Sequence, residues 1–362
     1  RNPEANAANI GELMQLYAAF RQGVSATLPA LPIQYADYAV WQRRTLCDSR
    51  LEALLRYWRR QLAGLPTLTL VTDRPRPPVA TFRGAFLDVA FDAELTSGVE
   101  ALARRHDATL FQTLLAAFKC VLARYAGQTD IVVGAPIANR TRPEIEGLIG
   151  FFVNSVVLRT DLSGDPTFAE IVARVRSATI AAYEHQELPF ERLVEELQPQ
   201  RDMTRNPLVQ VTFQIQNAPG AQREKPEGLD LPVRIERATA IFDLAFSLWE
   251  TKQGLVGGVE YSTDIFDEAT VQRLMESLRC VLRCIVGDEK RRLSGLPLLT
   301  PEQRSKQMLL LQGESVDVAD YDLFASFRAR VQADPQAVVI LDDDYDLRTT
   351  LGQLLVVRVR TD

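Results

Sequence analysis

The chain has 362 residues, of which 46% are hydrophobic, enough for roughly two domains or lobes with buried cores. Its net charge is −6 and no lysine- and arginine-rich block appears, which argues against nucleic acid as a partner. No apolar run approaches the roughly 18 residues that a membrane-spanning helix needs, and no signal peptide is visible, so we expect a cytoplasmic protein. Residue 1 is Arg, from which we expect a segment of a longer polypeptide.

The cysteines and histidines do not form a metal-binding pattern. Two of the cysteines stand alone and two lie four residues apart on a predicted helix: Cys47, Cys120, Cys280 and Cys284. A metal pair on that helix would need further ligands, and the sequence contains only two histidines, His106 and His185. We therefore predict packed thiols and no metal site.

The first part of the chain is predicted to be helical. An amphipathic helix is expected over 8–22, and a proline-containing connector follows it. A long helix is expected over 35–62, stopped by Gly64 and Pro66. The proline-rich stretch 72–78 then predicts a rigid linker and an internal boundary.

An α/β pattern follows this boundary. Apolar residues at spacings of three and four predict helices, and short β-branched or aromatic runs predict strands. The predicted strands are 84–91, 130–134, 151–159, 208–216, 231–236, 241–249 and 254–262. The predicted helices are 93–105, 109–125, 166–184, 190–197 and 267–286.

The composition changes near residue 290. We predict a linker over 291–320, inside which Thr300 caps a helix that has Pro301 at its first position. A helix and then a strand are expected over 323–341.

A polar pair, Asn154 and Ser155, interrupts the apolar strand predicted over 151–159. Asn is depleted in central strands unless something local needs its amide. The amide is expected either to face a cavity or ligand, or to pair with backbone at a strand irregularity. The residue pattern leaves both alternatives open.

Several separate stretches resemble, in the correct order, the condensation domains of nonribosomal peptide synthetases. Each alone is a weak signal, but the ordered set is specific and covers about residues 8–290. The stretches are LPIQYADYAVWQ at 31–42, the passage from Tyr57 to Pro75, GAPIANR at 134–140, IGFFVN at 149–154, HQELPFE at 185–191 and RDMTRNPL at 201–208. The last departs from the family pattern by a Thr in place of Ser at position 204.

The resemblance implies an α/β fold similar to chloramphenicol acetyltransferase, built from two lobes with a tunnel between them. Residues 1–72 would be the end of the first lobe, 73–290 the second lobe, 291–320 a linker and 321–362 the start of an adenylation domain. The family joins acyl or aminoacyl groups through an amide. These groups arrive on the phosphopantetheine arms of carrier proteins, and the domain itself binds no cofactor.

One departure from the family is decisive for activity. The family carries His-His-x-x-x-Asp-Gly, whose second His is the proposed base or positioning group, and no two histidines adjoin in this sequence. We therefore expect an N-terminally truncated chain that is inactive alone. The alternatives are a non-catalytic remnant, a carrier-binding module, or another acyltransferase of the same fold.

The resemblance places Asn154 and Ser155 near the tunnel. Asn139 and Arg140 are further candidates for its lining, and their alternative is to fix a loop by hydrogen bonds. The remaining motif residues are expected to be structural: His185, Gln186, Pro189, Phe190, Arg201, Asn206, Pro207 and Asp243.

Two of these structural residues have alternatives. His185 could act as an acid or base, but a hydrogen bond at a helix end is favoured. Asp243 suggests a strand that crosses between the lobes, against the alternative of a plain edge strand.

Overall fold

The computed structural model describes the chain in eight segments and divides it into two compact units, 1–300 and 301–362. The described residues are 3–25, 28–197, 202–216, 238–251, 253–312, 323–336, 338–342 and 347–350. The predicted strand over 231–236 and the motif residue Arg201 lie outside them.

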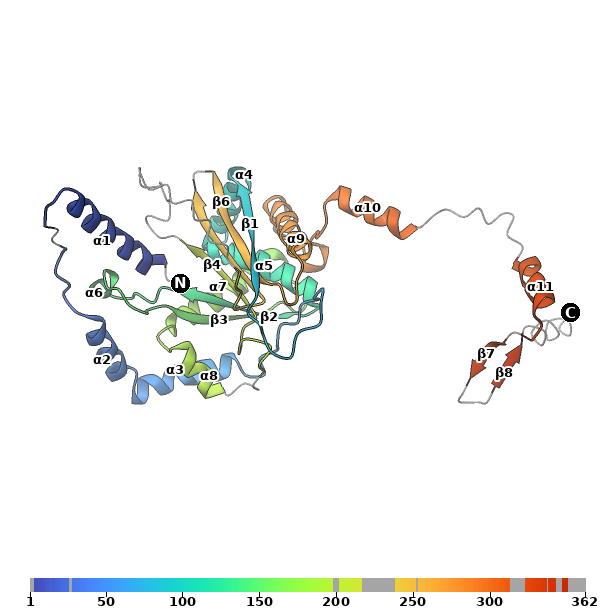
Figure 1. The fold of residues 1–362 in the computed structure, drawn as a ribbon, viewed down its shortest axis with the longest axis horizontal. Coiled ribbons are helices and arrows are strands. Elements are labelled where there is room, and N and C mark those ends of the chain that lie inside the picture. The colour runs from blue at the N-terminus through green and yellow to red at the C-terminus, as the bar shows by residue number, and fades with distance from the viewer. Residues whose placement is uncertain are drawn as a thin grey trace. The chain divides into compact units, whose positions relative to one another are not determined.

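A six-stranded sheet forms the centre of the first unit (Figure 1). Its strands are β1 (Gly84–Asp92), β2 (Asp130–Ile137), β3 (Asn154–Asp161), β4 (Val211–Gln216), β5 (Leu244–Thr251) and β6 (Gly254–Ser262). Their order is β1-β6-β5-β4-β2-β3. The pairs β2–β4 and β4–β5 are parallel and the other three pairs are antiparallel. The mixed α/β fold that the sequence predicts is confirmed.

The helices that pack against this sheet are α4 (Ala93–Arg105), α5 (Leu110–Ala126), α7 (Phe168–Glu184), α9 (Glu268–Gly287) and the shorter α8 (Phe190–Leu197). The unit also contains a short α6 (Pro143–Glu146) and a 3-10 turn, η1 (Leu293–Gly295). Along β5, Leu244, Phe246 and Leu248 are buried, whereas the residues between them are partly exposed. This alternation is typical of a sheet that a helical layer covers on one face.

Helix α5 lies at the middle of that layer. Every residue from Gln112 to Ala123 is buried, so the helix is enclosed on all sides, although its sequence predicts a single apolar face. Phe118 meets Phe213 and Phe246 of β4 and β5 with ring centroids about 5.5 Å apart. Its neighbour Lys119 is fully buried. Because α5 is enclosed, it holds the positions of the strands that it contacts, among them β4 and β5.

The long helix predicted over 35–62 is wrong in one respect, because the chain breaks it into two helices. These are α2 (Tyr35–Thr45) and α3 (Asp48–Gln61). The amide of Leu46 closes α2 on the Gln42 carbonyl, and Asp48 takes a positive φ of 44°. A helix cannot continue through a left-handed residue, so the chain turns here.

The first helix, α1 (Pro3–Arg21), matches the helix predicted at 8–22. Its apolar residues Leu13, Tyr17 and Phe20 are exposed. No helix among the described residues is long and apolar enough to cross a membrane.

The second unit contains α10 (Pro301–Gln312), α11 (Leu323–Ala333), and a hairpin of β7 (Val338–Asp342) and β8 (Leu347–Thr350). The predicted helix start at Pro301 is confirmed, as is the helix-then-strand order over 323–341.

Candidate functional site

The site begins where the β2–β3 hairpin opens. The last residue pair of that hairpin is Ile137 and Asn154, and the loop between them carries two of the predicted motifs. Asn139 has a positive φ of 55°, which Asn tolerates better than most residues. Its left-handed backbone turns the loop out of the sheet.

Arg140 holds this loop in shape. Its guanidinium donates to the carbonyls of Ile145 and Glu146, the latter at 2.9 Å, and to that of Leu148 at 2.9 Å. It also lies 4.4 Å from the ring centroid of Phe152. The structure therefore shows the loop-fixing role that was the alternative to lining a tunnel.

Asn154 connects the hairpin to a second loop. Its amide nitrogen donates to the carbonyls of Gln186 and Leu188, each at 2.8 Å. Its amide oxygen accepts from the backbone N–H of Ser155 and of Phe190, each at 2.9 Å. All its hydrogen-bonding positions are used within the chain, and the side chain is buried.

The structure thus shows the backbone pairing that the sequence left open for Asn154. Its strand begins at this residue, which pairs with Ile137, rather than at 151. A place for Asn154 in the wall of a tunnel stays a prediction.

The turn that Asn154 holds contains the predicted residues from His185 to Phe190. His185 ends α7, and its Nδ1 lies 2.8 Å from the Ala181 carbonyl, which confirms the hydrogen bond predicted at a helix end. Its ring stacks on Tyr57 at 3.7 Å. The Pro189 carbonyl accepts from Leu193 in the first turn of α8.

Helix α3 secures the same turn from outside. Trp58 Nε1 donates to the His185 carbonyl at 3.1 Å, and Arg50 pairs with Glu187 at 2.9 Å. The turn is therefore fixed by both β3 and α3, far apart in the sequence.

Helix α2 closes the site on its third side. The Tyr35 hydroxyl donates to the Phe151 carbonyl at 2.9 Å, and its ring lies so close to Gly150 that a side chain there would overlap it. The rings of Tyr38 and Phe152 are 4.8 Å apart, and the Arg142 guanidinium lies over Trp41.

A small cleft lies where the two loops and α2 meet. Its lining residues are Tyr38, Trp41, Gln42, Thr45, Leu46, Asn139, Thr141 and Glu187. Burial, together with Tyr35 and Glu187, raises the pKa of the Tyr38 hydroxyl, so this phenol stays neutral. Among these described lining residues there is no histidine, cysteine or lysine. The cleft can pack and hydrogen-bond a ligand.

Ser155 follows Asn154 on β3, opposite Pro136, and is partly buried. Of the predicted tunnel-lining residues, the structure places Asn139 directly in the wall of the cleft. Tyr38 and Trp41 also line the cleft. The sequence identified the 31–42 motif that contains them, but it did not mark these two residues as lining residues.

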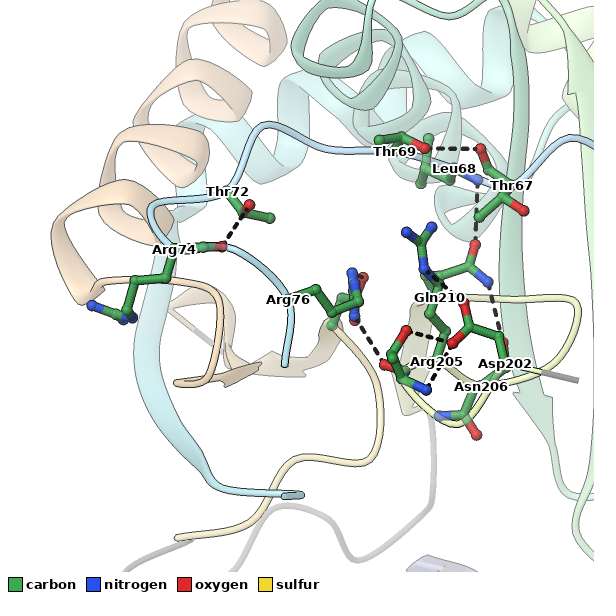
Figure 2. Close-up of polar contacts among 12 residues, drawn as sticks. Thr67, Leu68, Thr69, Thr72, Arg74, Arg76, Asp202, Arg205, Asn206 and Gln210 are labelled. Carbon is green, nitrogen blue, oxygen red and sulfur yellow. Dashed lines mark hydrogen bonds and ion pairs between the residues drawn. The ribbon is translucent and has the colours of Figure 1, made fainter. Parts of the chain in front are cut away.

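The remaining motif residues that the structure describes lie at the opposite end of the sheet, where β4 and β5 begin. Arg76, labelled in Figure 2, forms a bidentate pair with Asp243, at 2.8 and 2.5 Å, and also donates to the Thr204 carbonyl. Asn206 donates to the Ile241 carbonyl at 2.5 Å, and the Pro207 carbonyl accepts from Val209. This second group of motif residues does not contribute to the cleft.

Asp243 precedes β5, which lies between β4 and β6, so the alternative of a plain edge strand is wrong. Both sides of β5 are hydrogen-bonded to neighbours. Sequence reasoning missed Arg76, which lies in the proline-rich linker. A half-buried cation is hard to recognise there because prolines dominate the pattern.

No group of three or more metal-ligating side chains occurs within the part of the chain that the structure describes. His106 lies beside the ion pair of Arg105 with Glu289, at the C-terminal end of α4.

The sheet order and the four motif stretches around the cleft define a class of protein. The chain belongs to the condensation domain family, whose model matches residues 9–310.

The similar proteins are large synthetases. Malpinin synthetase of Mortierella alpina is 42% identical over 345 residues, which are 95% of this chain and 4% of that protein. A linear gramicidin synthase polypeptide of Brevibacillus parabrevis is 44% identical over 313 residues, 85% of this chain and 6% of that protein. The chain therefore spans only about one twentieth of these relatives.

Solved structures agree with this fold. The X-domain from teicoplanin biosynthesis has a TM-score of 0.75 at 31% identity and covers 82% of this chain and 69% of that one. A four-domain nonribosomal peptide synthetase, AB3403, bound to AMP and glycine, has a TM-score of 0.75 at 24% identity. The match covers 96% of this chain and 27% of that one.

Proposed function

We propose that this chain forms one side of the tunnel in a condensation domain that joins two carrier-bound acyl or aminoacyl groups through an amide. The observation that supports this most is that three motif stretches, those of α2, the 134–140 loop and the 185–191 turn, line one cleft, while Asn154 of a fourth stretch holds the turn in place. Asn139 and Asn154 would border the path of the substrates.

The cleft supplies walls but not the reactive base. An amine that attacks a thioester must lose a proton, and a histidine is the usual group that accepts it near neutral pH. His185 is stacked on Tyr57 and bonded to Ala181, and His106 lies beside Glu289 on another face. The base would be the family's histidine pair, which these 362 residues do not contain.

The implied partners are carrier proteins, whose phosphopantetheine arms would enter the tunnel, and an adenylation domain. The β7–β8 hairpin with α11 would be the start of that domain, and the whole would work in the cytoplasm. The domain divisions that we infer are 1–72, 73–290, 291–320 and 321–362.

The direct test is amide formation by this chain with one donor and one acceptor carrier, each loaded. We expect no product from the chain alone. A polypeptide that adds an in-frame His-His-x-x-x-Asp-Gly segment before residue 1 should give product, and changing the second His of that segment to Ala should abolish it. Product from the chain alone would contradict the proposed need for an added base.

The second candidate function is a non-catalytic module that binds carriers. The exposed apolar residues of α1 favour this candidate, because such side chains often mark a surface that contacts another protein. Carrier binding by the chain, together with inactivity of the extended polypeptide, would support this candidate instead.

A further inference from the structure

A second hollow lies at the end of the sheet opposite the cleft, and we call it the far-edge groove. It lies where three separate stretches meet: 76–82, 203–206 and 240–243. Ser262, Asp264 and Ile265 complete its lining. Residues 203–206 of the RDMTRNPL motif lie here, and the proposed condensation chemistry gives them no part.

The rim of the far-edge groove is apolar and open to solvent. Met203 is 71% exposed, Ile241 61% and Phe82 54%, and each comes from a different one of the three stretches. Large apolar side chains that gather at one hollow mark an interaction site more often than scattered ones do.

Phe82 is held in this position by its backbone. It has a positive φ of 58°, which is strained for an aromatic residue, and its carbonyl accepts from the Ala240 amide at 2.9 Å. Gly84 packs so closely on Ala240 that a side chain there would overlap it. Strain maintained by surrounding contacts is common where a side chain must be presented to a partner.

The charged groups of the groove are unequally matched. Asp243 is occupied by Arg76, and Asp264 accepts from the Thr81 hydroxyl at 2.7 Å. Arg205 pairs through its Nε with Asp202 at 3.3 Å, and its terminal N–H groups make no hydrogen bond in the described part of the chain. Figure 2 shows Arg76 and Arg205 beside the 202–210 loop. A guanidinium carries five N–H donors, so Arg205 retains donors for a carboxylate.

We propose that the far-edge groove docks an extended segment of a neighbouring synthetase domain, with a carboxylate on Arg205 and an apolar side chain on Phe82, Met203 and Ile241. The inference rests on the proposed function, since it takes the neighbour from the same synthetase. The terminal N–H groups of Arg205 beside an apolar rim fit one acidic residue next to one apolar residue.

The size of the relatives supports a tethered neighbour. The matching region is only 4% to 6% of those synthetases, so the surfaces nearest to it belong to the same polypeptide. Tethering raises the effective concentration to roughly millimolar, at which one anchored side chain and one ion pair suffice for docking.

The test is site-specific cross-linking in the synthetase that carries this chain. Benzoylphenylalanine replaces Ile241 at the rim, and the irradiated protein is digested and sequenced by mass spectrometry. We expect one cross-linked segment outside these 362 residues, with Asp or Glu within a few residues of Leu, Ile, Met or Phe. Its yield should fall about tenfold or more in Arg205→Gln, because a charge-assisted hydrogen bond is lost.

The matched control is Arg192→Gln on α8, an exposed arginine paired with Glu195, which should leave the yield unchanged. Thermal unfolding checks each variant. If Arg205→Gln does not fold, Arg205→Lys replaces it, and an intermediate yield is expected because Lys lacks the planar fork.

Cross-links only within these 362 residues, only to a second copy, or with a yield that both arginine variants leave unchanged would overturn the inference. The readout does not require amide formation, so its failure is distinguishable from failure of the proposed function.

Discussion

The two ends of the sheet, here called the cleft edge and the far edge, are both built from loops that polar side chains hold, but they use different chemistry. At the cleft edge, Asn154 and Arg140 bond almost entirely to backbone carbonyls and amides. At the far edge, Arg76 and Asp243 bond mainly to each other. A substitution can remove a side chain but not a backbone partner. The stability of the cleft edge therefore depends on single side chains, whereas that of the far edge depends on matched pairs of side chains.

The sharpest test of this contrast is Asn154→Ala. Four hydrogen bonds disappear, and the buried carbonyls of Gln186 and Leu188 and the N–H of Phe190 lose their partner. We expect the free energy of unfolding to fall by about 4 kcal/mol, measured by urea denaturation. Asn139→Gly is the control, since Gly accepts the left-handed backbone there, and a change within about 0.5 kcal/mol is expected. Equal effects of the two substitutions would remove the distinction.

The far edge should respond differently to single and double changes. Arg76→Met leaves Asp243 nearly buried without its cation, and we expect a loss of about 3 kcal/mol in urea denaturation. Adding Asp243→Leu removes the stranded charge, so the double variant should regain most of that loss. A double variant as unstable as the sum of the two single variants would show that the pair is not the stabilising unit.

Lys119 tests the interior between the two edges. Its ammonium donates to the Leu158 carbonyl and the Thr160 hydroxyl, each at 2.7 Å, and burial lowers its pKa to about 7. The unfolded chain keeps this proton up to the ordinary pKa of 10.5, so between these values it binds more protons than the folded chain. Stability should therefore rise with pH, by about 1 kcal/mol per unit, and be lost as the pH falls toward 7.

Comparison with Lys119→Met isolates this contribution from other groups. The difference in unfolding free energy between the two proteins, measured at pH 7.5 and at pH 9.5, should change by about 2 kcal/mol. A difference that is the same at both pH values would mean that Lys119 is not desolvated in the folded chain.

The smallest effect is expected for an exposed ion pair outside both edges. Arg192 and Glu195 are 58% and 62% exposed, and Arg192→Ala should change stability by less than about 0.5 kcal/mol in the same urea assay. A loss comparable to that of Arg76→Met would show that burial does not separate the two pairs.

The sequence predicted most of the fold because its signals are local. The capping box at Thr109 and Gln112 and the left-handed Gly127 bound α5 close to the predicted 109–125, and β6 matches its predicted range. The break at Leu46 was missed, since no Gly or Pro marks it and a positive φ at Asp48 depends on packing.

The site was predictable only in part. The motifs identified the correct segments, yet the partners of Asn154 lie 32 to 36 residues away, beyond any local pattern. The burial of Lys119 could not be predicted from the sequence either. A lysine in an apolar helix is expected to reach solvent, and only the enclosure of α5 by the sheet and its neighbours prevents it.

The contact of Tyr35 with Gly150 has a consequence for how this chain can vary. The ring occupies the space that any side chain at 150 would need, so a larger residue at 150 requires a smaller one at 35. A chain with Ala at 150 and a smaller residue at 35 would lose this contact between α2 and the strand entry, while the Tyr38–Phe152 and Arg142–Trp41 contacts would remain to hold α2.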